Sequence, residues 1–536
     1  MSRATRIAKL EARVEALLGQ VARLTAEVER LKPFEARVAV LERENAALRE
    51  RLAKSSRNSS KPPSSDGDKE RAERRTKKPT GRAAGAQVGH PKHERPEWPA
   101  AKVAKRVVLR PKQCEKCAAP LAGEDTEPLR HQVFELPKVE PLVTEYVRHS
   151  LGCECCGHVT RAPLPPGVPT RVFGPSVDAV ASYLMGTHRM GKRGTAEALY
   201  DLYQLPISVG SVVGSQQEMS EALADPYCEI VAHAQAAPIK NADETSWVEG
   251  NGKKAKAWLW TLVTAGAIVF MIQKTRATSG AIKLLLNGKT RLGELVFGVL
   301  GTDRHGAYNF WPLDRRQFCW SHLRRDFTAI SERPGASGCV GTKLIEETDR
   351  MFHWWHRVRD GTLSRSSFRI YMRPLRKRVD ALLAEGIELG DKKTAATCAK
   401  LLKAKAALWT FVDSEGIEPT NNAAERAVRH GVIYRKLSGG TKSAASSRFV
   451  ERMLTAHATL RLQGRPILPF LEAAAEARLR RTTPPLASPP PRLHASTPHR
   501  SLIANFMIAS CDHEVRRERV RSTFRARCSR TGSGAW

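Results

Sequence analysis

Three acidic residues stand where a strand end or a helix start could hold their carboxylates in place. Asp243 belongs to the segment ADETSW, which precedes the strand-like runs WLWTLVTAG and AIVFMIQ, and Asp303 ends another strand-like run. Asn422 and Glu425 have the spacing of an N-cap and an N3 residue, so we expect Glu425 in the first turn of a helix. This order is typical of an α/β core in which acids from a central strand, its neighbour and a covering helix converge.

The chemistry of such a trio follows from its charge. Three clustered carboxylates repel one another and stay ionised together only beside cations, and their hard oxygens suit Mg²⁺ or Mn²⁺. Two such ions about 4 Å apart can clamp the attacking and leaving oxygens of a phosphoryl transfer. We therefore expect Asp243, Asp303 and Glu425 to be catalytic residues that hold divalent metal. A single acid of this kind, taken alone, is more often a helix cap or an ion-pair partner.

Two C-x-x-C segments form a second candidate site. Cys114 with Cys117, and Cys153 with Cys156, can each place two thiolates on one tetrahedral ion, and four sulfur ligands suit structural Zn²⁺. The 35 residues between Cys117 and Cys153 include the β-like runs HQVFELP and LVTEYVRH, which predict a hairpin between the two segments. Cys155 is a spare thiol. The alternative is four unrelated buried cysteines.

The overall charge narrows the range of partners. The chain of 536 residues carries 88 Lys and Arg against 55 Asp and Glu, a formal net charge of +33. Such a surplus points to a polyanion, with nucleic acid favoured over membrane. The N-terminus lacks the apolar segment of a signal peptide, and the longest apolar run, residues 257–272, reads as two buried strands with a turn. The clustering of the cysteines favours metal binding in a reducing, cytoplasmic compartment.

The N-terminal residues 1–53 predict a coiled coil. Leucines recur every seven residues from Leu10 to Leu31, with valines at the a positions between them, which favours a parallel two-stranded coil. After Pro33 the seam resumes in a shifted frame with Asn45 at an a position. We expect at least a homodimer, and the alternative is a helix that packs on its own chain. Residues 54–98 are predicted to be a disordered basic linker.

The rest of the chain divides by composition into four predicted regions. Ser208 is the predicted N-cap of a helix that follows a turn at residues 205–206, which would fit the second helix of a helix-turn-helix. The regions are a zinc-ribbon-like module at 99–166, a helical region with this possible helix-turn-helix at 167–236, a catalytic domain at 237–471 with a helical insertion at about 328–410, and a basic, Pro- and Arg-rich, disordered tail at 472–536.

Several further side chains have open roles. Arg426, Arg429, Arg435 and Lys436 follow Glu425 at positions suited to DNA phosphates, although a solvated helix face would place some of them outward too. In the insertion, Trp354, Trp355 and Trp409 either pack a core, which we favour, or stack on bases. Cys319 and His322 form half of a metal site at most, and a structural role is favoured.

These segments together resemble one family. The coiled coil, the tract NSSKPPSSD, the C-x-x-C segments, ADETSW, TDRHGAYN, FCWSHLRRDF and NNAAERAVRHGVIYRKLSGG resemble the transposases of the insertion sequence 66 (IS66) family, up to about residue 471. The resemblance implies a ribonuclease-H-like core and a DDE triad at Asp243, Asp303 and Glu425 with Mg²⁺ or Mn²⁺. It further implies a bacterial, nucleoid-associated protein of the cytoplasm.

The function that this resemblance implies is DNA transposition. The protein would cleave the ends of its element to expose 3′-hydroxyls and transfer them into target DNA, with the zinc module and the helical region binding the terminal inverted repeats. Accessory proteins of the same element are further expected partners, and no membrane is involved. Two alternatives remain open: an inactive transposase remnant that dimerises on DNA, and a metal-dependent nuclease without strand transfer.

Overall fold

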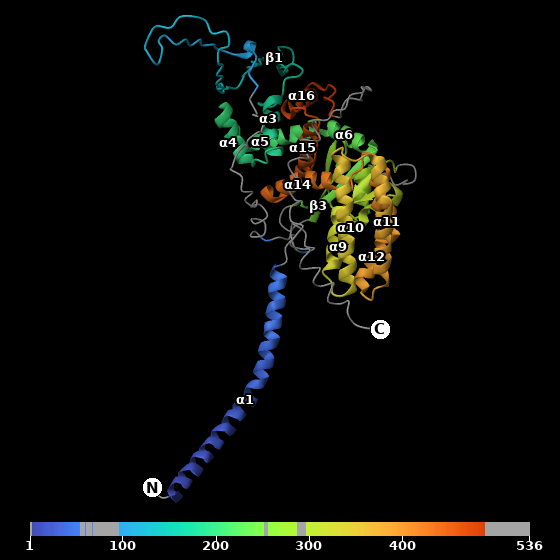
Figure 1. The fold of residues 1–536 in the computed structure, drawn as a ribbon. Coiled ribbons are helices and arrows are strands. Elements are labelled where there is room, and N and C mark those ends of the chain that lie inside the picture. The colour runs from blue at the N-terminus through green and yellow to red at the C-terminus, as the bar shows by residue number, and fades with distance from the viewer. Residues whose placement is uncertain are drawn as a thin grey trace. The chain divides into compact units, whose positions relative to one another are not determined.

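The computed structural model describes residues 3–53, 96–250, 256–286 and 296–487, together with residues 59 and 67. It contains two compact units. The first comprises Met1–Thr76, Gly298–Asn422 and Arg492–Trp536, and the second comprises Lys77–Phe297 and Ala423–Pro491. Both units combine helices with strands (Figure 1), which confirms the predicted α/β class. No helix in the described part of the chain is long and apolar enough to span a membrane.

Three antiparallel strands lie at the centre of the second unit. They are β3 (Ile239–Val248), β4 (Lys256–Val263) and β5 (Ile268–Gln273), paired in the order β5-β4-β3. Asp243 of β3 is the register partner of Thr261, and Thr261 is the partner of Phe270. Almost every residue of β4 and β5 is buried, because helices cover both faces of these strands. The apolar run 257–272 thus forms the two buried strands that its composition predicts.

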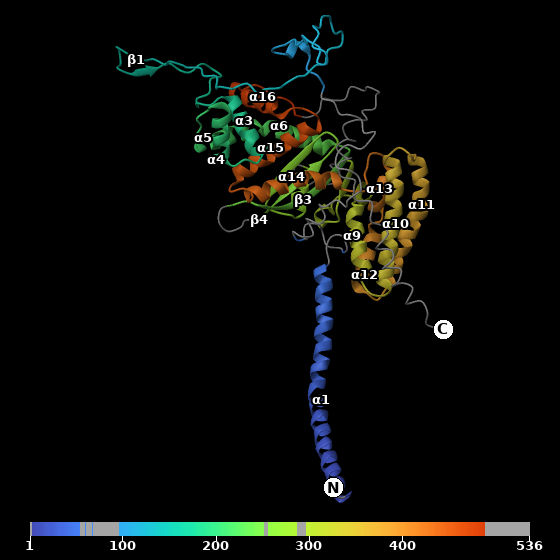
Figure 2. The same ribbon diagram turned by 60° about the vertical axis from the view of Figure 1, so that its left-hand side comes forward.

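The helices of the second unit come from both ends of its sequence. Ser208 caps the first turn of α5 by accepting a hydrogen bond from the Ser211 N–H at 3.1 Å, as predicted. The helices are α3 (Pro175–Gly186), α4 (Lys192–Tyr203), α5 (Val209–Ala222), α6 (Ala224–Ala236), α7 (Thr278–Leu286), α14 (Asn422–Ser438, in this unit from Ala423 onward), α15 (Ala444–Leu462) and α16 (Ile467–Arg480). Figure 2 shows α14 beside β3.

Helix α15 covers the backbone edge of β5. The N–H groups of Ile268 and Phe270 donate to the hydroxyls of Thr459 and Thr455 at 3.0 and 2.9 Å, and the N–H of Ile272 donates to the Glu451 carboxylate. Four residues of helix rise about 6.0 Å and two residues of strand about 6.7 Å, so the two repeats nearly coincide. Side chains of α15 therefore satisfy the outward N–H groups of an edge strand, which would otherwise be open to pairing.

The first unit holds two parallel strands and a stack of helices. Strand β6 (Val299–Thr302) pairs with β7 (Arg316–Phe318), and short 3-10 turns, η3 (Gly306–Tyr308) and η4 (Leu313–Arg315), lie between them in the sequence. The helices that follow are α9 (Trp320–Ser331), α10 (Ala336–Arg359), α11 (Arg365–Glu388), α12 (Lys392–Lys403) and α13 (Ala406–Asp413). Figures 1 and 2 show α9 to α12 side by side.

Aromatic packing holds these helices together. Trp409 of α13 packs against Trp320 with ring centroids 4.8 Å apart in a tilted arrangement, and Trp355 packs against Phe411 at 5.5 Å. Both Trp355 and Trp409 are buried, so they serve the core. Trp354 is only half-buried, and it stacks on the exposed Tyr371 of α11 at 4.4 Å. The core interpretation thus fits two of the three tryptophans.

Helix α1 (Arg3–Ala53) is continuous through Pro33. Its Leu and Val seam is exposed, with Leu17 at 53% and Leu24 at 58% of full exposure. A helix with an exposed apolar stripe of this regularity fits a coiled-coil partner, so the predicted self-association stays a prediction.

Some sequence-based expectations differ from the structure. Residues 131–149, all of them described, form no strand, so the predicted hairpin is absent from them, and Leu142 is fully exposed. Short strands β1 (Ser150–Gly152) and β2 (Val159–Arg161) pair instead around the second C-x-x-C segment, and η2 (Ala100–Lys102) lies near the start of the module. Isolated β-like runs without an apolar layer to cover do not form a stable sheet.

One predicted region boundary also differs from the structure. Helix α16 extends to Arg480 with Ala474 and Ala477 buried, so the predicted start of the tail at residue 472 falls inside a packed helix. Residues 488–536, and the linker apart from residues 59, 67 and 96–98, lie outside the described residues.

The contact between α15 and β5 gives a stability prediction. Substituting Thr455→Val preserves the shape of the side chain but leaves the buried Phe270 N–H without an acceptor, so we expect a loss of about 1–3 kcal/mol in unfolding free energy. Urea denaturation followed by circular dichroism measures the loss. Thr455→Ser retains the hydroxyl and should lose less. Equal stability of Thr455→Val and wild type would contradict this role of the hydrogen bond.

Candidate functional site

Asp243 lies in the middle of β3 rather than at a strand end, where the sequence pattern placed it. It is half-buried, and its Oδ1 accepts a hydrogen bond from the Glu244 N–H at 2.9 Å. Successive residues of a strand point to opposite faces, so the side chains of Asp243 and Glu244 lie on opposite faces of β3. Glu244 is buried and accepts two hydrogen bonds from Arg276, at 3.0 Å from Nε and 2.8 Å from Nη2. Glu244 is therefore a structural ion-pair partner.

The face of β3 that carries Asp243 is covered by α14. Two residues farther along this face, Thr245 contacts the Arg435 guanidinium, and Trp247 packs against Tyr434 with ring centroids 6.1 Å apart. Arg435 also donates to the Ser246 backbone carbonyl and hydroxyl. These contacts fix the C-terminal half of α14 on β3.

A glycine brings α14 close to the sheet. A Cβ atom added at Gly431 would lie 2.0 Å from the Leu259 side chain of β4, so a larger residue would push the helix outward. Leu259 pairs with Thr245, and directly opposite residues point to the same face. Helix α14 therefore lies on the face that carries Asp243.

Glu425 lies in the first turn of this helix, as predicted. The helix begins at Asn422, however, so Asn422 is the first helical residue rather than the N-cap, and the predicted capping spacing is wrong by one position. Within the second unit, the structure places Asp243 on β3 and Glu425 on the helix that covers the Asp243 face.

Asp303 belongs to the first unit, directly after β6. Its Oδ1 accepts the His305 N–H at 2.9 Å, which holds the carboxylate in a tight turn. Arg316, on the neighbouring β7, donates from Nη2 to the Thr302 hydroxyl at 3.1 Å and to the Asp303 carbonyl at 3.3 Å. Burial lowers the pKa of Arg316 to about 10, and the negative charge of Asp303 opposes this shift.

Sequence reasoning missed Arg316. It is a fully buried guanidinium beside the turn of a candidate catalytic acid, so it positions that turn. The sequence shows only an arginine two residues before Phe318, in the run RRQFCW, and arginine side chains are usually exposed.

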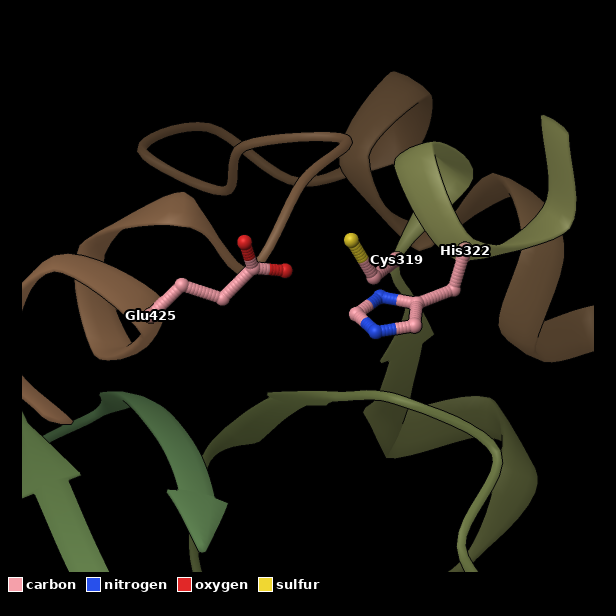
Figure 3. A group of neighbouring side chains, drawn as sticks. All are labelled: Cys319, His322 and Glu425. Carbon is pink, nitrogen blue, oxygen red and sulfur yellow. The ribbon is translucent and has the colours of Figure 1, made fainter. Parts of the chain in front are cut away.

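Cys319 and His322 lie at the start of α9 in the first unit. Figure 3 shows both side chains, and the Cys319 Sγ lies within 4.8 Å of a ligand nitrogen of the His322 ring. Cys319 is buried, and its sulfur accepts the Asn421 N–H at 3.2 Å. The thiol therefore has a structural contact, in line with the favoured interpretation.

The basic residues after Glu425 differ in their environments. Arg429 and Lys436 are exposed, and Arg426 is half-buried. Arg435 is half-buried and hydrogen-bonded to β3, as described above, so its guanidinium contributes to the packing of α14. Exposure thus favours Arg429 and Lys436 over Arg435 for contact with DNA.

The two C-x-x-C segments adopt the same local turn. The Ala118 N–H donates to the Cys114 carbonyl at 2.9 Å, and the Gly157 N–H donates to the Cys153 carbonyl at 2.8 Å. Ala118 and Gly157 occupy equivalent positions and both have positive φ, 57° and 70°.

Backbone N–H groups aim at the first sulfur of each segment. Hydrogen bonds from the Cys117 and Lys116 N–H groups lower the pKa of Cys114, and those from Cys156 and Cys155 lower the pKa of Cys153. Among the residues that the structure describes, these cysteines do not form a group of three or more ligands within 4.8 Å of one another. Each C-x-x-C segment therefore forms the same turn around its first thiol, and a zinc site built from both segments stays a prediction.

Comparison with known proteins adds an independent line of evidence. Residues 2–96 match a family of unknown function, DUF6444. An uncharacterized protein of Sinorhizobium fredii, y4qI, is 25% identical over 259 residues, which cover 42% of this chain and 44% of that protein. The chain thus spans less than half the length of this curated relative.

A second family match covers a longer part of the chain. Residues 172–448, more than half of the chain, match the family described as Transposase IS66 family. This match includes β3, β6 and α14, the elements that carry Asp243, Asp303 and Glu425. The chain belongs to the IS66 transposase family.

Proposed function

We propose that this protein is a DNA transposase that cleaves the ends of its insertion sequence and joins the exposed 3′-hydroxyls to target DNA. One observation carries the proposal: α14 covers the face of β3 that holds Asp243 and has Glu425 in its first turn, within the residues that match the IS66 family. Family membership supports the class of function, and the placement of these two acids supports the chemistry.

A DDE site at Asp243, Asp303 and Glu425 is chemically suited to Mg²⁺ or Mn²⁺. The donors are carboxylate oxygens, and all three side chains are half-buried, so they can reach both solvent and the polypeptide. When bound, such ions supply Lewis acidity for phosphoryl transfer. The chain itself holds Asp243 on a strand paired along its length, Asp303 in a turn fixed by the His305 N–H, and Glu425 on a helix fixed by Arg435.

The order of elements supports a ribonuclease-H-like core for this site. Three consecutive antiparallel strands, β3 to β5, are followed in the sequence by α7 and then by β6, with one candidate acid on the first strand and another just after β6. The helices α9 to α13 then precede α14, so they constitute the insertion between the second and third acids.

Two further parts of the proposal concern structural zinc and self-association. The matched turns at Cys114–Cys117 and Cys153–Cys156 support a structural zinc site in a DNA-binding module. The exposed seam of α1 supports a parallel homodimer through the coiled coil. The DNA of the element ends and of the target is the proposed substrate, with accessory proteins of the same element as proposed partners.

The catalytic proposal predicts the effect of single substitutions. Asp243→Asn, Asp303→Asn and Glu425→Gln should each reduce Mg²⁺-dependent cleavage of an end-containing duplex by at least about 100-fold, because each removes a charged metal ligand. Binding of the same duplex in the absence of metal should change little. Gel analysis of labelled oligonucleotides measures both cleavage and strand transfer.

Asp314→Asn serves as the matched control, because Asp314 is an exposed acid of η4 and should leave cleavage unchanged. Wild-type cleavage by any of the three variants would reject the triad. Binding without cleavage by the wild type would favour the inactive remnant, and cut but unjoined DNA would favour a nuclease.

The zinc proposal predicts metal content. Purified protein should contain about one zinc per chain by mass spectrometry of metals, and Cys114→Ser or Cys153→Ser should lose most of it. Cys228→Ser is the control, since Cys228 is an exposed thiol on α6 outside both segments. Full zinc content in the Cys114→Ser protein would contradict the site.

A further inference from the structure

One of the three tryptophans in the helical insertion does not serve its core. Trp354 is half-buried on α10, and Tyr371 of α11, which stacks on it, keeps 44% of its side chain exposed. The two helices lie side by side within the first unit (Figures 1 and 2), and neither ring belongs to the proposed catalytic site. Core packing therefore does not account for this pair.

Two further side chains surround the indole of Trp354. The rings of Trp354 and Tyr371 lie almost parallel, with centroids 4.4 Å apart and 12° between their planes, and His353 packs edge-on against the indole at 5.1 Å. The Arg357 guanidinium lies over the indole, 5.4 Å from the ring centroid. All of these side chains except Trp354 are exposed. We call the four side chains the aromatic platform.

Basic side chains continue from the platform along both helices. Arg350 lies one turn before Trp354 on α10, and Arg378 lies two turns after Tyr371 on α11. Both guanidiniums pair with the carboxylate of Glu347, at 2.5 and 2.9 Å. The Glu347 side chain is only 7% exposed, whereas the two arginine side chains are 55% and 46% exposed. One buried negative charge thus serves two positive charges at the surface.

The first half of α11 contains no acidic residue. Residues 365–378 include six Lys and Arg and no Asp or Glu. Arg376 faces α13, where it pairs with Asp413 at 2.9 Å, while Arg378 faces α10 and Lys377 is exposed. Cations thus lie on more than one side of this helix, which suits a long anion such as a nucleic acid better than a small one.

The alternative is that the platform only stabilises the pair of helices. Aliphatic side chains pack helices together without an exposed phenol or a guanidinium over an indole. Binding of an unpaired nucleic-acid strand uses each part, because flat rings stack on bases and guanidiniums contact phosphates or extend the stack. Protein partners also select Trp, Tyr and Arg, but six cations without an acid favour a polyanion.

We propose that the aromatic platform binds an unpaired DNA strand, with one base stacked on the exposed ring of Tyr371. Arg350 lies one turn before Trp354 and Arg357 one turn after it, so cations that can contact phosphates flank the stack along α10. The identity of the anion rests on the proposed transposase function. Bases inside a duplex stack on one another and offer no free face, so the platform selects single strands and frayed ends.

The test measures binding of labelled single strands to the full-length protein by fluorescence anisotropy. One strand is an oligothymidylate of about 15 nucleotides, and the other has the same length with abasic sugars in place of the thymidines. Salt at about 0.3 M weakens the purely electrostatic contacts of this basic chain. We expect the wild type to bind the oligothymidylate at least about fivefold more tightly than the abasic strand, because only the former has bases to stack.

Substitutions of one residue test the stacking. Tyr371→Ala and Tyr371→Leu should each reduce affinity for the oligothymidylate at least about fivefold and remove most of the preference over the abasic strand. The leucine variant retains apolar packing, so it separates stacking from folding. Tyr371→Phe keeps the ring and should bind as the wild type does. Tyr200→Ala is the matched control, since Tyr200 is an exposed tyrosine of α4 in the second unit and should change neither affinity.

Charge variants test the phosphate contacts. Arg357→Gln should weaken binding of both strands, because both contain phosphates. Arg373→Gln removes an equal charge from an exposed position two residues after Tyr371, which is on the opposite side of α11, and should change affinity less than about twofold. Circular dichroism confirms that each variant is folded.

Photo-crosslinking locates the bound base directly. A strand that contains 5-iodouracil reacts on irradiation with aromatic side chains that stack on it, and mass spectrometry of the digested protein identifies the attached peptide. The peptide that contains Tyr371 should carry the crosslink in the wild type, and the crosslink should be lost in Tyr371→Leu.

Several results would overturn the proposal. Equal affinity of the wild type for the two strands, or an unchanged preference in Tyr371→Leu, would show that no base stacks on the platform. Crosslinks confined to other segments would do the same. A change in the sedimentation of Tyr371→Leu with unchanged DNA binding would identify an interface between copies of the chain. Binding here needs no cleavage, so this test and the triad assay fail independently.

Discussion

The need to satisfy buried backbone N–H groups on β5 determines the arrangement of the second unit. Thr459, Thr455 and Glu451 of α15 accept hydrogen bonds from alternate residues of that strand, and this is possible only when the helix runs along the strand. The same helix begins at Ala444, with Ser443 as its N-cap, directly after the loop that contains Thr441. Thr441 in turn donates its N–H to the Val248 carbonyl at 2.9 Å and accepts the Trp247 indole N–H at 3.0 Å. Helix α15 and the loop before it therefore connect β5 to the end of β3.

The contacts of Thr441 with the end of β3 limit where α14 can lie. The segment between α14 and α15 is short, and Gly440, with a φ of 97°, approaches the Val248 carbonyl so closely that a Cβ atom would lie 2.3 Å from it. Arg435 and Gly431 then fix α14 on the face of β3 that carries Asp243. The proposed catalytic role of Glu425 thus depends on packing contacts that lie up to ten residues away from it.

Sequence reasoning succeeded where the signal is local. The α/β class, the two buried strands in 257–272, the N-cap at Ser208 and the position of Glu425 in a first turn all follow from patterns within a few residues. It was wrong about Asp243 at a strand end and about the hairpin in 131–149, because strand boundaries depend on cross-strand partners that the local sequence does not contain. Arg316 and the pair of Arg189 with His430 could not be predicted, since the latter two are 241 residues apart.

The central claim is that Asp243, Asp303 and Glu425 share one metal site. Replacing Mg²⁺ with Fe²⁺ and adding ascorbate and peroxide generates hydroxyl radicals at the bound ion, which cut the polypeptide next to its ligands. Mass spectrometry of the fragments from the full-length protein should show cuts near all three residues, and excess Mg²⁺ should suppress them. Cuts near only one of the three acids, or only at sites elsewhere in the chain, would contradict the claim.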